Sequence, residues 1–297
     1  MLGTTASGAT TAMLVVALTA GCGTTSALVS DEVSSVVPYD GPMLLDQDFS
    51  DDATPRERSG AAGRALECDG AAYDGGAGDY VDGGLESAQS SAEQALQNWL
   101  DNQSWGLPTS GYRVEREDSD RVLLSYDVDE RTRIAFIAAN GIGDYNGETG
   151  WGIESWAQCD PAELPASVTE PLGIEVWEDS SGARVPVTQI RSFAGAEHCD
   201  WQDITFLILG QDEDGRGDRS DDADEFLRDT TGELADYLRS TYDATASLPK
   251  RAVDTGFSRD GRRVWLDPNG DAAYLVSTDD PDDVERWPAS TEPIRCA

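Results

Sequence analysis

A short apolar run near the N-terminus indicates which part of this chain forms the mature protein and in which compartment that part folds. Residues 1–21 carry no charged side chain, and Met13–Ala20 is almost wholly apolar. The run is much shorter than the roughly 20 residues that cross a bilayer as a helix, but it has the size of the apolar part of a secretory signal peptide. We therefore predict that residues 1–21 are a signal peptide and that the remainder folds outside the cytoplasm.

The apolar run ends at Gly21 and Cys22. The stretch Leu18–Cys22 resembles the lipobox of bacterial lipoproteins, whose cysteine thiol takes a diacylglyceryl group. The resemblance implies that Cys22 is the lipidation site and that lipid chains anchor the mature chain to the extracytoplasmic face of the cell membrane. Met1–Thr5 departs from the pattern because it contains no Lys or Arg. The alternative is a buried N-terminal helix with an ordinary core cysteine.

The composition separates a tether from a globular body. Residues 22–65 are rich in Ser, Thr, Gly, Asp and Pro without a helical or strand period, which predicts a flexible tether. Such a tether would hold the body on the order of 35 Å from the membrane. The rest has aromatic and apolar residues enough for a core, and we expect two α+β units, at 66–170 and 171–297.

The charge balance excludes nucleic acid as a partner. The chain has 57 Asp+Glu against 21 Lys+Arg, for a net charge of −36, and a field of this sign repels phosphate backbones. A solvated acidic surface is the simplest interpretation, and adaptation to high salt is the alternative.

Four cysteines follow the tether, with no Cys-x-x-Cys pair: Cys68, Cys159, Cys199 and Cys296. An even count in an exported protein predicts disulfides, and three pairings are possible. An internal comparison favours one of them. Two parts of the chain repeat the order Cys, helix, three β runs with a Trp in the last, and Cys. This order pairs Cys68 with Cys159 and Cys199 with Cys296.

The two copies supply most of the expected elements. The helices are expected at Leu85–Asp101 and Asp221–Thr241, from apolar residues at helical spacing. The β runs are expected at Arg121–Leu124, Ile134–Ile137 and Ser155–Trp156, and again at Arg263–Leu266, Ala273–Val276 and Arg286–Trp287.

Other segments complete the expected fold. Asp267–Gly270 has the chemistry of a hairpin turn. Gly173–Trp177 and Arg184–Val187 predict a hairpin with its turn at 180–182, and the wholly apolar Ile204–Leu209 predicts a central, doubly buried strand. The class is then α+β, with antiparallel sheets, helices on one face and two similar helix-plus-three-strand units.

Catalytic constellations fail for lack of parts. His198 is the only histidine, and no Gly-x-Ser-x-Gly sequence is present. Cys199 beside it is predicted to be oxidised, and Lys250, the only lysine, follows Pro249 in an expected surface loop. Closely spaced Cys and His ligands for zinc are missing, as are nucleotide-binding glycine motifs. We predict no catalytic residue, no cofactor and no enzyme activity.

Two weaker candidates remain. The acidic run 211–222 offers Asp212, Asp214 and Asp218 as calcium ligands, but it fails as an EF-hand and otherwise reads as a solvated loop. Tyr145, Trp151 and Trp156 lie near glycines and could form a platform for a sugar or peptide, although aromatic residues usually belong to the core.

A second resemblance concerns the body of the chain. His198–Gln202, Val284–Pro288 and the terminal Cys296–Ala297 resemble a group of exported proteins and lipoproteins of actinobacteria without an assigned activity, from about Ala65 to the end. The resemblance supports an extracytoplasmic location and implies no chemistry.

These observations rank three functions. The first is a membrane-anchored, non-catalytic binding or scaffolding module, whose partners are the membrane, through its lipid, and an envelope protein or small ligand. The second is a receptor that holds a small solute or cation in the cleft between the two units. The third is a hydrolase of wall polymers that uses paired carboxylates, although 57 acidic residues make close pairs uninformative.

Overall fold

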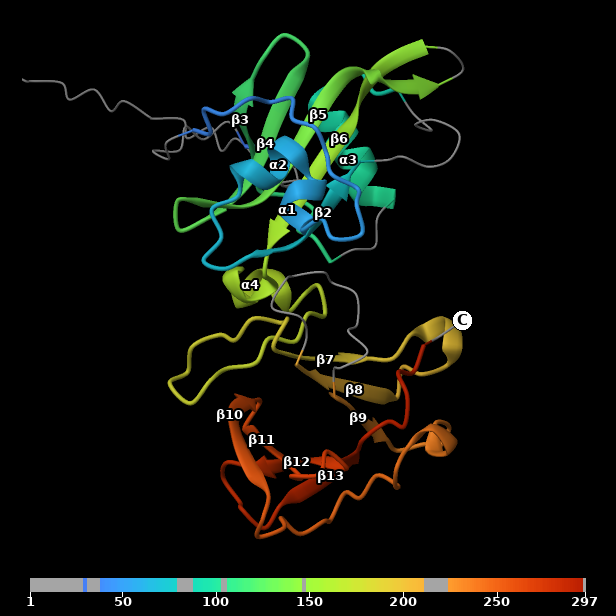
Figure 1. The fold of residues 1–297 in the computed structure, drawn as a ribbon. Coiled ribbons are helices and arrows are strands. Elements are labelled where there is room, and N and C mark those ends of the chain that lie inside the picture. The colour runs from blue at the N-terminus through green and yellow to red at the C-terminus, as the bar shows by residue number, and fades with distance from the viewer. Residues whose placement is uncertain are drawn as a thin grey trace, which may run out of the picture.

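The computed structural model describes residues 29–30, 38–78, 88–102, 106–145, 148–210 and 224–295. The predictions for Cys22, for Cys296 and for the acidic run with Asp212, Asp214 and Asp218 lie outside these residues. The chain forms two lobes (Figure 1). We call the part built on the six-stranded sheet, up to residue 159, the first lobe, and the part from residue 170 onward the second lobe.

The first lobe is built on one sheet with the strand order β1-β3-β4-β5-β6-β2. Neighbouring strands are antiparallel, apart from the short parallel pair of β1 with β3. Strands β3 to β6 follow one another as a meander, as the sequence predicts for this region. The strands are β1 (Val29–Ser30), β2 (Ala72–Ala77), β3 (Tyr112–Glu117), β4 (Arg121–Val128), β5 (Arg131–Tyr145) and β6 (Glu148–Cys159).

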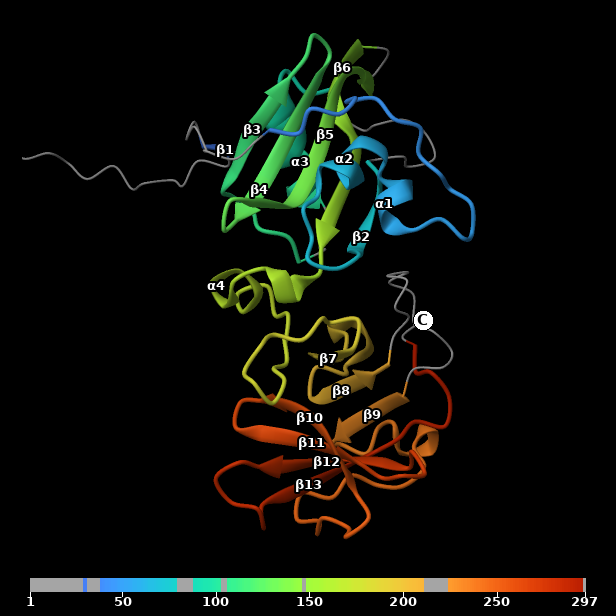
Figure 2. The same cartoon turned by 60° about the vertical axis from the view of Figure 1, so that its left-hand side comes forward.

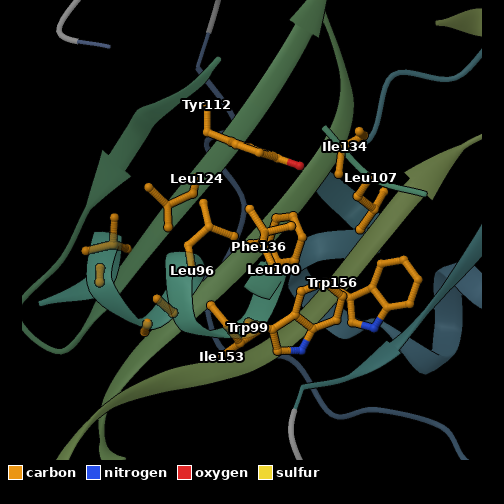
Figure 3. Close-up of a cluster of buried hydrophobic side chains, with 14 of the residues drawn as sticks. Leu96, Trp99, Leu100, Leu107, Tyr112, Leu124, Ile134, Phe136, Ile153 and Trp156 are labelled. Atoms are coloured by element: carbon orange, nitrogen blue, oxygen red, sulfur yellow. The ribbon is translucent and has the colours of Figure 1, made fainter. Parts of the chain in front are cut away.

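Helix α3 (Ala92–Asn102) covers one face of this sheet. It begins inside the helix expected at Leu85–Asp101 and ends one residue beyond it, and the first residue of the expected range is outside the described part. Leu96 and Trp99 are buried at helical spacing, and Trp99 packs on Phe136 with ring centroids 5.1 Å apart (Figure 3). The amphipathic face read from the sequence is therefore the face that contacts the sheet.

The opposite face is covered by α1 (Pro55–Arg58), α2 (Gly60–Ala65) and the segment before them. The prediction of a flexible tether through residue 65 is wrong for the segment around Met43 and for α2, because these pack on the sheet. Ala61, Ala62 and Ala65 are buried there although the segment has few large apolar residues. A Cβ at Gly63 would lie 2.3 Å from the Arg56 carbonyl oxygen, so the absence of side chains is what permits the close approach.

The second lobe contains two antiparallel sheets that pack on each other. One has the order β7-β8-β9 and the other is the meander β10-β11-β12-β13. Apolar residues of both sheets form one cluster between them, among them Leu207, Phe226, Val264 and Leu275. The strands are β7 (Ile190–Ala194), β8 (Ile204–Leu209), β9 (Asp224–Asp229), β10 (Val253–Arg259), β11 (Arg262–Leu266), β12 (Ala272–Ser277) and β13 (Val284–Pro288).

Two local predictions for this lobe are confirmed. Strand β8 is the central strand of its sheet, with Leu207 buried toward the other sheet and Phe206 buried on the opposite face. The turn at Asp267–Gly270 joins β11 to β12 and is closed by a hydrogen bond of 2.8 Å from the Gly270 amide to the Asp267 carbonyl. Figure 2 shows that the β7–β9 sheet lies between the first lobe and the β10–β13 sheet.

The helix predicted at Asp221–Thr241 is wrong. Its described part forms strand β9 and a single 3₁₀ turn, η3 (Ala235–Tyr237). Phe226 and Leu227 are buried on opposite faces of β9, which is strand periodicity. The Asp229 side chain then accepts the backbone N–H groups of Thr231 and Gly232, which turns the chain. The described part of the second lobe therefore has no counterpart of α3, and each meander has four strands where three were expected.

Short elements join the lobes. These are η1 (Pro161–Glu163) and α4 (Ala166–Thr169), which follow β6 and lie at the junction (Figure 1). The predicted hairpin follows them, with the Val185 amide donating to the Trp177 carbonyl at 2.8 Å. No helix in the part of the chain that the structure describes is both long and apolar enough to span a bilayer.

Candidate ligand-binding cleft between the lobes

Of the three aromatic residues proposed as a platform, the structure describes the side chains of Trp151 and Trp156, and both pack against the core of the first lobe. Trp156 is only 7% exposed and packs in the core beside Trp99, with ring centroids 5.4 Å apart (Figure 3). Trp151 is half-buried against the same core cluster. Tyr145 ends strand β5, and its side chain lies outside the described part. Trp156 therefore serves the core of the first lobe.

The described cysteines are disulfide-bonded, and His198 and Lys250 lie at the surface. Cys68 and Cys159 form a disulfide, with 5.3 Å between their Cα atoms, as the internal comparison predicts. Cys199 is also disulfide-bonded, in the 3₁₀ turn η2 (Glu197–Cys199), to a partner outside the described residues. His198 in this turn and Lys250 are exposed.

A cleft of about 910 Å³ that suits a ligand lies at the junction of the lobes. This volume lies within the usual range of small-molecule sites. Both lobes contribute to it. Its lining consists of Asp69, Gly70, Ala71, Ala72, Tyr73, Asp160, Ala162, Glu163, Arg184, Pro186, Thr188, Gln189, Leu209, Gly210 and Phe257.

The disulfide sets the position of the first-lobe wall. Cys68 immediately precedes the lining segment 69–73, and Cys159 immediately precedes Asp160 and η1. Ala72 and Cys159 are also partners in the register of β2 with β6. One covalent bond and one strand pair therefore fix both segments to each other at the end of the sheet.

Asp160 connects the two lobes. Its Oδ1 atom accepts the Ala162 amide at 2.8 Å and the Val187 amide of the second lobe at 3.0 Å. The side chain is buried, and burial raises the pKa of Asp160, while hydrogen bonds from the backbone of Ala162, Val187 and Thr188 act in the opposite direction. The carboxylate therefore accepts hydrogen bonds from backbone amides on both sides of the junction and links the two lobes.

Glu163 and Asp69 are neutralised from within the first lobe. Glu163 accepts the backbone amides of Asp69 at 2.9 Å and Gly70 at 3.3 Å and forms an ion pair with Arg133, whose side chain is 6% exposed. Asp69 pairs with Arg131 and, at 2.9 Å, with Arg133. Hydrogen bonds from Arg131 hold the pKa of Asp69 below its ordinary value, and Arg133 acts in the same direction. All three cleft carboxylates therefore have donors of their own.

Tyr73 adds a phenol to the cleft wall. Burial raises the pKa of Tyr73, whereas the charge of Arg191 lowers it, with a side-chain hydrogen bond from Arg191 acting in the same direction. The hydroxyl is therefore neutral at physiological pH and can donate or accept a hydrogen bond. Ala71, Pro186, Leu209 and Phe257 give the cleft an apolar portion.

Arg184 is the one arginine among the lining residues, and it is held by oxygen atoms that carry no charge. Its Nε donates to the Ala162 carbonyl at 3.0 Å, and one terminal nitrogen donates to Thr169 Oγ1 at 3.1 Å. Burial lowers the pKa of Arg184, and the carboxylates of Glu178, Glu170 and Asp160 oppose this through charge alone, without a hydrogen bond. The guanidinium remains cationic because its ordinary pKa is so high.

One cluster of described residues places three potential metal-ligand atoms close together. Ligand atoms of Cys68, Cys159 and Glu163 lie within 4.8 Å of one another. Both sulfur atoms are in the disulfide, so they are not thiolate ligands, and Glu163 is already paired with Arg133. The chemistry of this cluster therefore suits a structural clamp and not a metal centre.

The sequence predicts a cleft between two units but not which residues line it. The signals in the sequence are local and weak: an acidic residue after each cysteine of the first disulfide, and Arg133 directly before an apolar β run. Only the fold brings residues 69–73 next to residues 184–189.

No protein-family model matches the chain, and no curated protein and no solved structure is significantly similar to it.

Proposed function

We propose that this chain is a membrane-anchored extracytoplasmic lipoprotein whose body is a non-catalytic binding module, with its ligand site in the cleft between the lobes. The observation that carries the proposal is the cleft itself. It is large enough for a small organic molecule, both lobes line it, and it combines an apolar portion with a few polar groups.

The state of the polar groups favours binding over catalysis. A hydrolase of wall polymers needs two carboxylates that are free to exchange protons. Asp160 and Glu163 instead accept backbone amides, and Glu163 and Asp69 also pair with arginines. The same occupancy disfavours a metal cation in the cleft, because a cation would have to displace these donors.

The anchor is supported by the sequence at Leu18–Cys22 and by the disulfides, which belong to an oxidising compartment. The membrane is then the first partner, and a small ligand is the second.

The anchor is tested by Cys22→Ser. The wild-type chain should incorporate radioactive palmitate and partition into the detergent phase, whereas the variant should do neither. Palmitate labelling that survives the substitution would remove the anchor from the proposal.

The binding site is tested by filling the cleft. Ala71 is exposed at its wall, so Ala71→Trp should narrow the cleft while the fold is retained. A library of organic acids, amines, amino acids and sugars is screened by ligand-observed NMR against both proteins. The proposal expects at least one compound whose binding is lost in Ala71→Trp. A library in which every hit binds both proteins equally would overturn the cleft as the site.

A further inference from the structure

The carboxylates that line the cleft have hydrogen-bond or ion-pair partners, whereas the arginine that lines it has no ion-pair partner among the described residues. Each lining carboxylate has partners inside the protein: Asp160 accepts backbone amides, Asp69 pairs with arginines, and Glu163 does both. Arg184 has no such counter-ion. Its described hydrogen bonds go to the carbonyl oxygens of Pro161 and Ala162 and to the hydroxyl of Thr169.

Arg56 and Arg286 also donate to carbonyl oxygens, but of these three arginines only Arg184 lines the cleft. With a net charge of −36, the protein has more than enough carboxylates to pair each arginine. Most described arginines near acids do pair, as Arg113 does with Asp127 and Arg262 does with Asp283. Arg184 lines the cleft yet is fixed by neutral oxygen atoms, so its position is set while its charge is left available.

The fixed guanidinium also has donors to spare. A guanidinium carries five N–H groups in a planar fork. The described bonds of Arg184 use Nε and one terminal nitrogen, which leaves the second terminal nitrogen with both of its N–H groups. The cost of ordering this long side chain is already met by the protein, which favours binding of an anion.

On the basis of the proposed function, we infer that the ligand of the cleft is a small organic anion with one carboxylate and an apolar body. The carboxylate would accept hydrogen bonds from Arg184, and the apolar body would lie against Phe257, Leu209 and Pro186.

A single negative charge fits the site better than a phosphate dianion. Arg184 offers one unpaired positive charge among the lining residues, and the protein around it is strongly acidic. Solvent ions screen the distant acidic residues over a Debye length of about 8 Å at physiological ionic strength. The nearer carboxylates of Glu178, Glu170 and Asp160 remain, so a second negative charge on the ligand would add repulsion that one guanidinium does not offset.

The probes are phenylacetate and hexanoate, each compared with its neutral amide, and inorganic phosphate. Affinity is measured by isothermal titration calorimetry on the wild-type chain. We expect each acid to bind at least about tenfold more tightly than its amide, because a charge-assisted hydrogen bond is lost in the amide. Phosphate should not displace either acid.

Two variants connect this preference to the cleft. Arg184→Gln should weaken the acids by about tenfold and leave the amides nearly unchanged. The matched control Arg239→Gln removes an exposed arginine of the second lobe, and it should change neither. Ala71→Trp keeps Arg184 in place and should block the acids and the amides together, which covers the case in which Arg184→Gln does not fold.

Amides that bind as tightly as their acids, phosphate that competes with them, or no binding by either acid would each overturn the inference. The proposed function is judged separately by the library screen. An amine or sugar that binds the wild type and is lost in Ala71→Trp would retain the cleft as a site and refute the anionic ligand.

Discussion

The two meanders of this protein share a strand order and differ in what covers them. Strands β3–β6 and β10–β13 each run as four successive antiparallel neighbours. In the first lobe, helix α3 covers one face, and α1 and α2 cover the other. In the second lobe, the β7–β9 sheet covers one face, and the loop that contains Leu248 covers the other.

The difference shows which part of a fold is specified locally. A meander needs alternating side chains and suitable turns, and both occur within short stretches of sequence. Its cover comes from segments far away in the chain, whose apolar residues are few and differently spaced. The same topology is thereby stabilised by small buried alanines in one lobe and by a second sheet in the other.

The largest expected effect concerns the covalent clamp of the first lobe. The Cys68–Cys159 disulfide spans 91 residues. Replacing both cysteines by alanine should lower the free energy of unfolding by about 4–5 kcal/mol in the chain-entropy model, because the unfolded chain gains freedom. Urea unfolding followed by hydrogen exchange of β4 and β5 measures it. An unchanged midpoint for these strands would show that packing alone holds the first sheet.

The second prediction compares the two cores by the same substitution. Leu124 in β4 and Leu275 in β12 are both buried, at 0% and 5% exposure. Leu124→Ala and Leu275→Ala should each cost about 2–5 kcal/mol through lost burial and a residual cavity. Hydrogen exchange tells whether each substitution loosens only its own lobe. Equal loosening of both lobes by either variant would mean that the lobes unfold as one unit.

The sequence predicted what the strands themselves encode. The β runs around Leu124, Phe136, Val264 and Leu275 lie in strands, because β-branched and aromatic residues with clear turns leave few alternatives. Ile204–Leu209 was identified as a central strand for a similar reason, since a wholly apolar run must be buried on both faces.

The sequence misled where a cover element lacks a strong period. Thr54–Glu57 forms a capping box with Pro55 at the first helical position, and this is a helix start signal that the low apolar content of the following residues obscured. At Asp224–Asp229 the apolar pair Phe226 and Leu227 suited either a helix or a strand, and the neighbouring sheet decided.

The cleft could not be predicted residue by residue. Arg184 and Asp160 are ordinary charged residues in sequence, and their roles depend on distances between the lobes. What the sequence indicated was the absence of catalytic parts. A positive set of ligand contacts requires the fold, because the lining comes from five separate stretches of chain.

The third prediction compares two tyrosines. The Tyr112 hydroxyl in the first core is fully buried and has no hydrogen-bond partner among the described residues, whereas the Tyr242 hydroxyl donates to Glu285 Oε2 at 3.0 Å. Tyr112→Phe should be neutral or stabilise by up to about 1 kcal/mol, and Tyr242→Phe should cost about 0.5–1.5 kcal/mol. Thermal unfolding of both variants measures the two effects. A loss of stability in Tyr112→Phe would contradict the prediction for the buried hydroxyl.

The smallest effect separates two buried aspartates that accept similar backbone amides. Burial raises the pKa of Asp160 despite its hydrogen bonds. Asp229 is buried too, but the Thr231 hydroxyl and the amides of Leu234, Gly232 and Thr231 bring the pKa of Asp229 below its ordinary value. The folded state therefore binds the proton of Asp160 more tightly than the unfolded chain does, and it binds the proton of Asp229 less tightly.

These opposite shifts give opposite slopes of stability against pH. As pH rises from the ordinary aspartate pKa to the raised pKa of Asp160, this group withdraws stability; as pH falls from the ordinary value through the lowered pKa of Asp229, that group withdraws it. Each contribution stays below about 1.4 kcal/mol per pH unit, the limit for one proton. Above the ordinary aspartate pKa, Asp160→Asn should reduce the loss of unfolding free energy that the wild type shows as pH rises. Below the ordinary aspartate pKa, Asp229→Asn should reduce the loss that the wild type shows as pH falls. Urea unfolding at a series of pH values, with exposed Asp51→Asn as the control, measures the differences from wild type. If the difference in unfolding free energy between variant and wild type changed with pH in the same direction for both variants, the pKa values of Asp160 and Asp229 would be shifted in the same direction. The predicted contrast between the two aspartates would then be wrong.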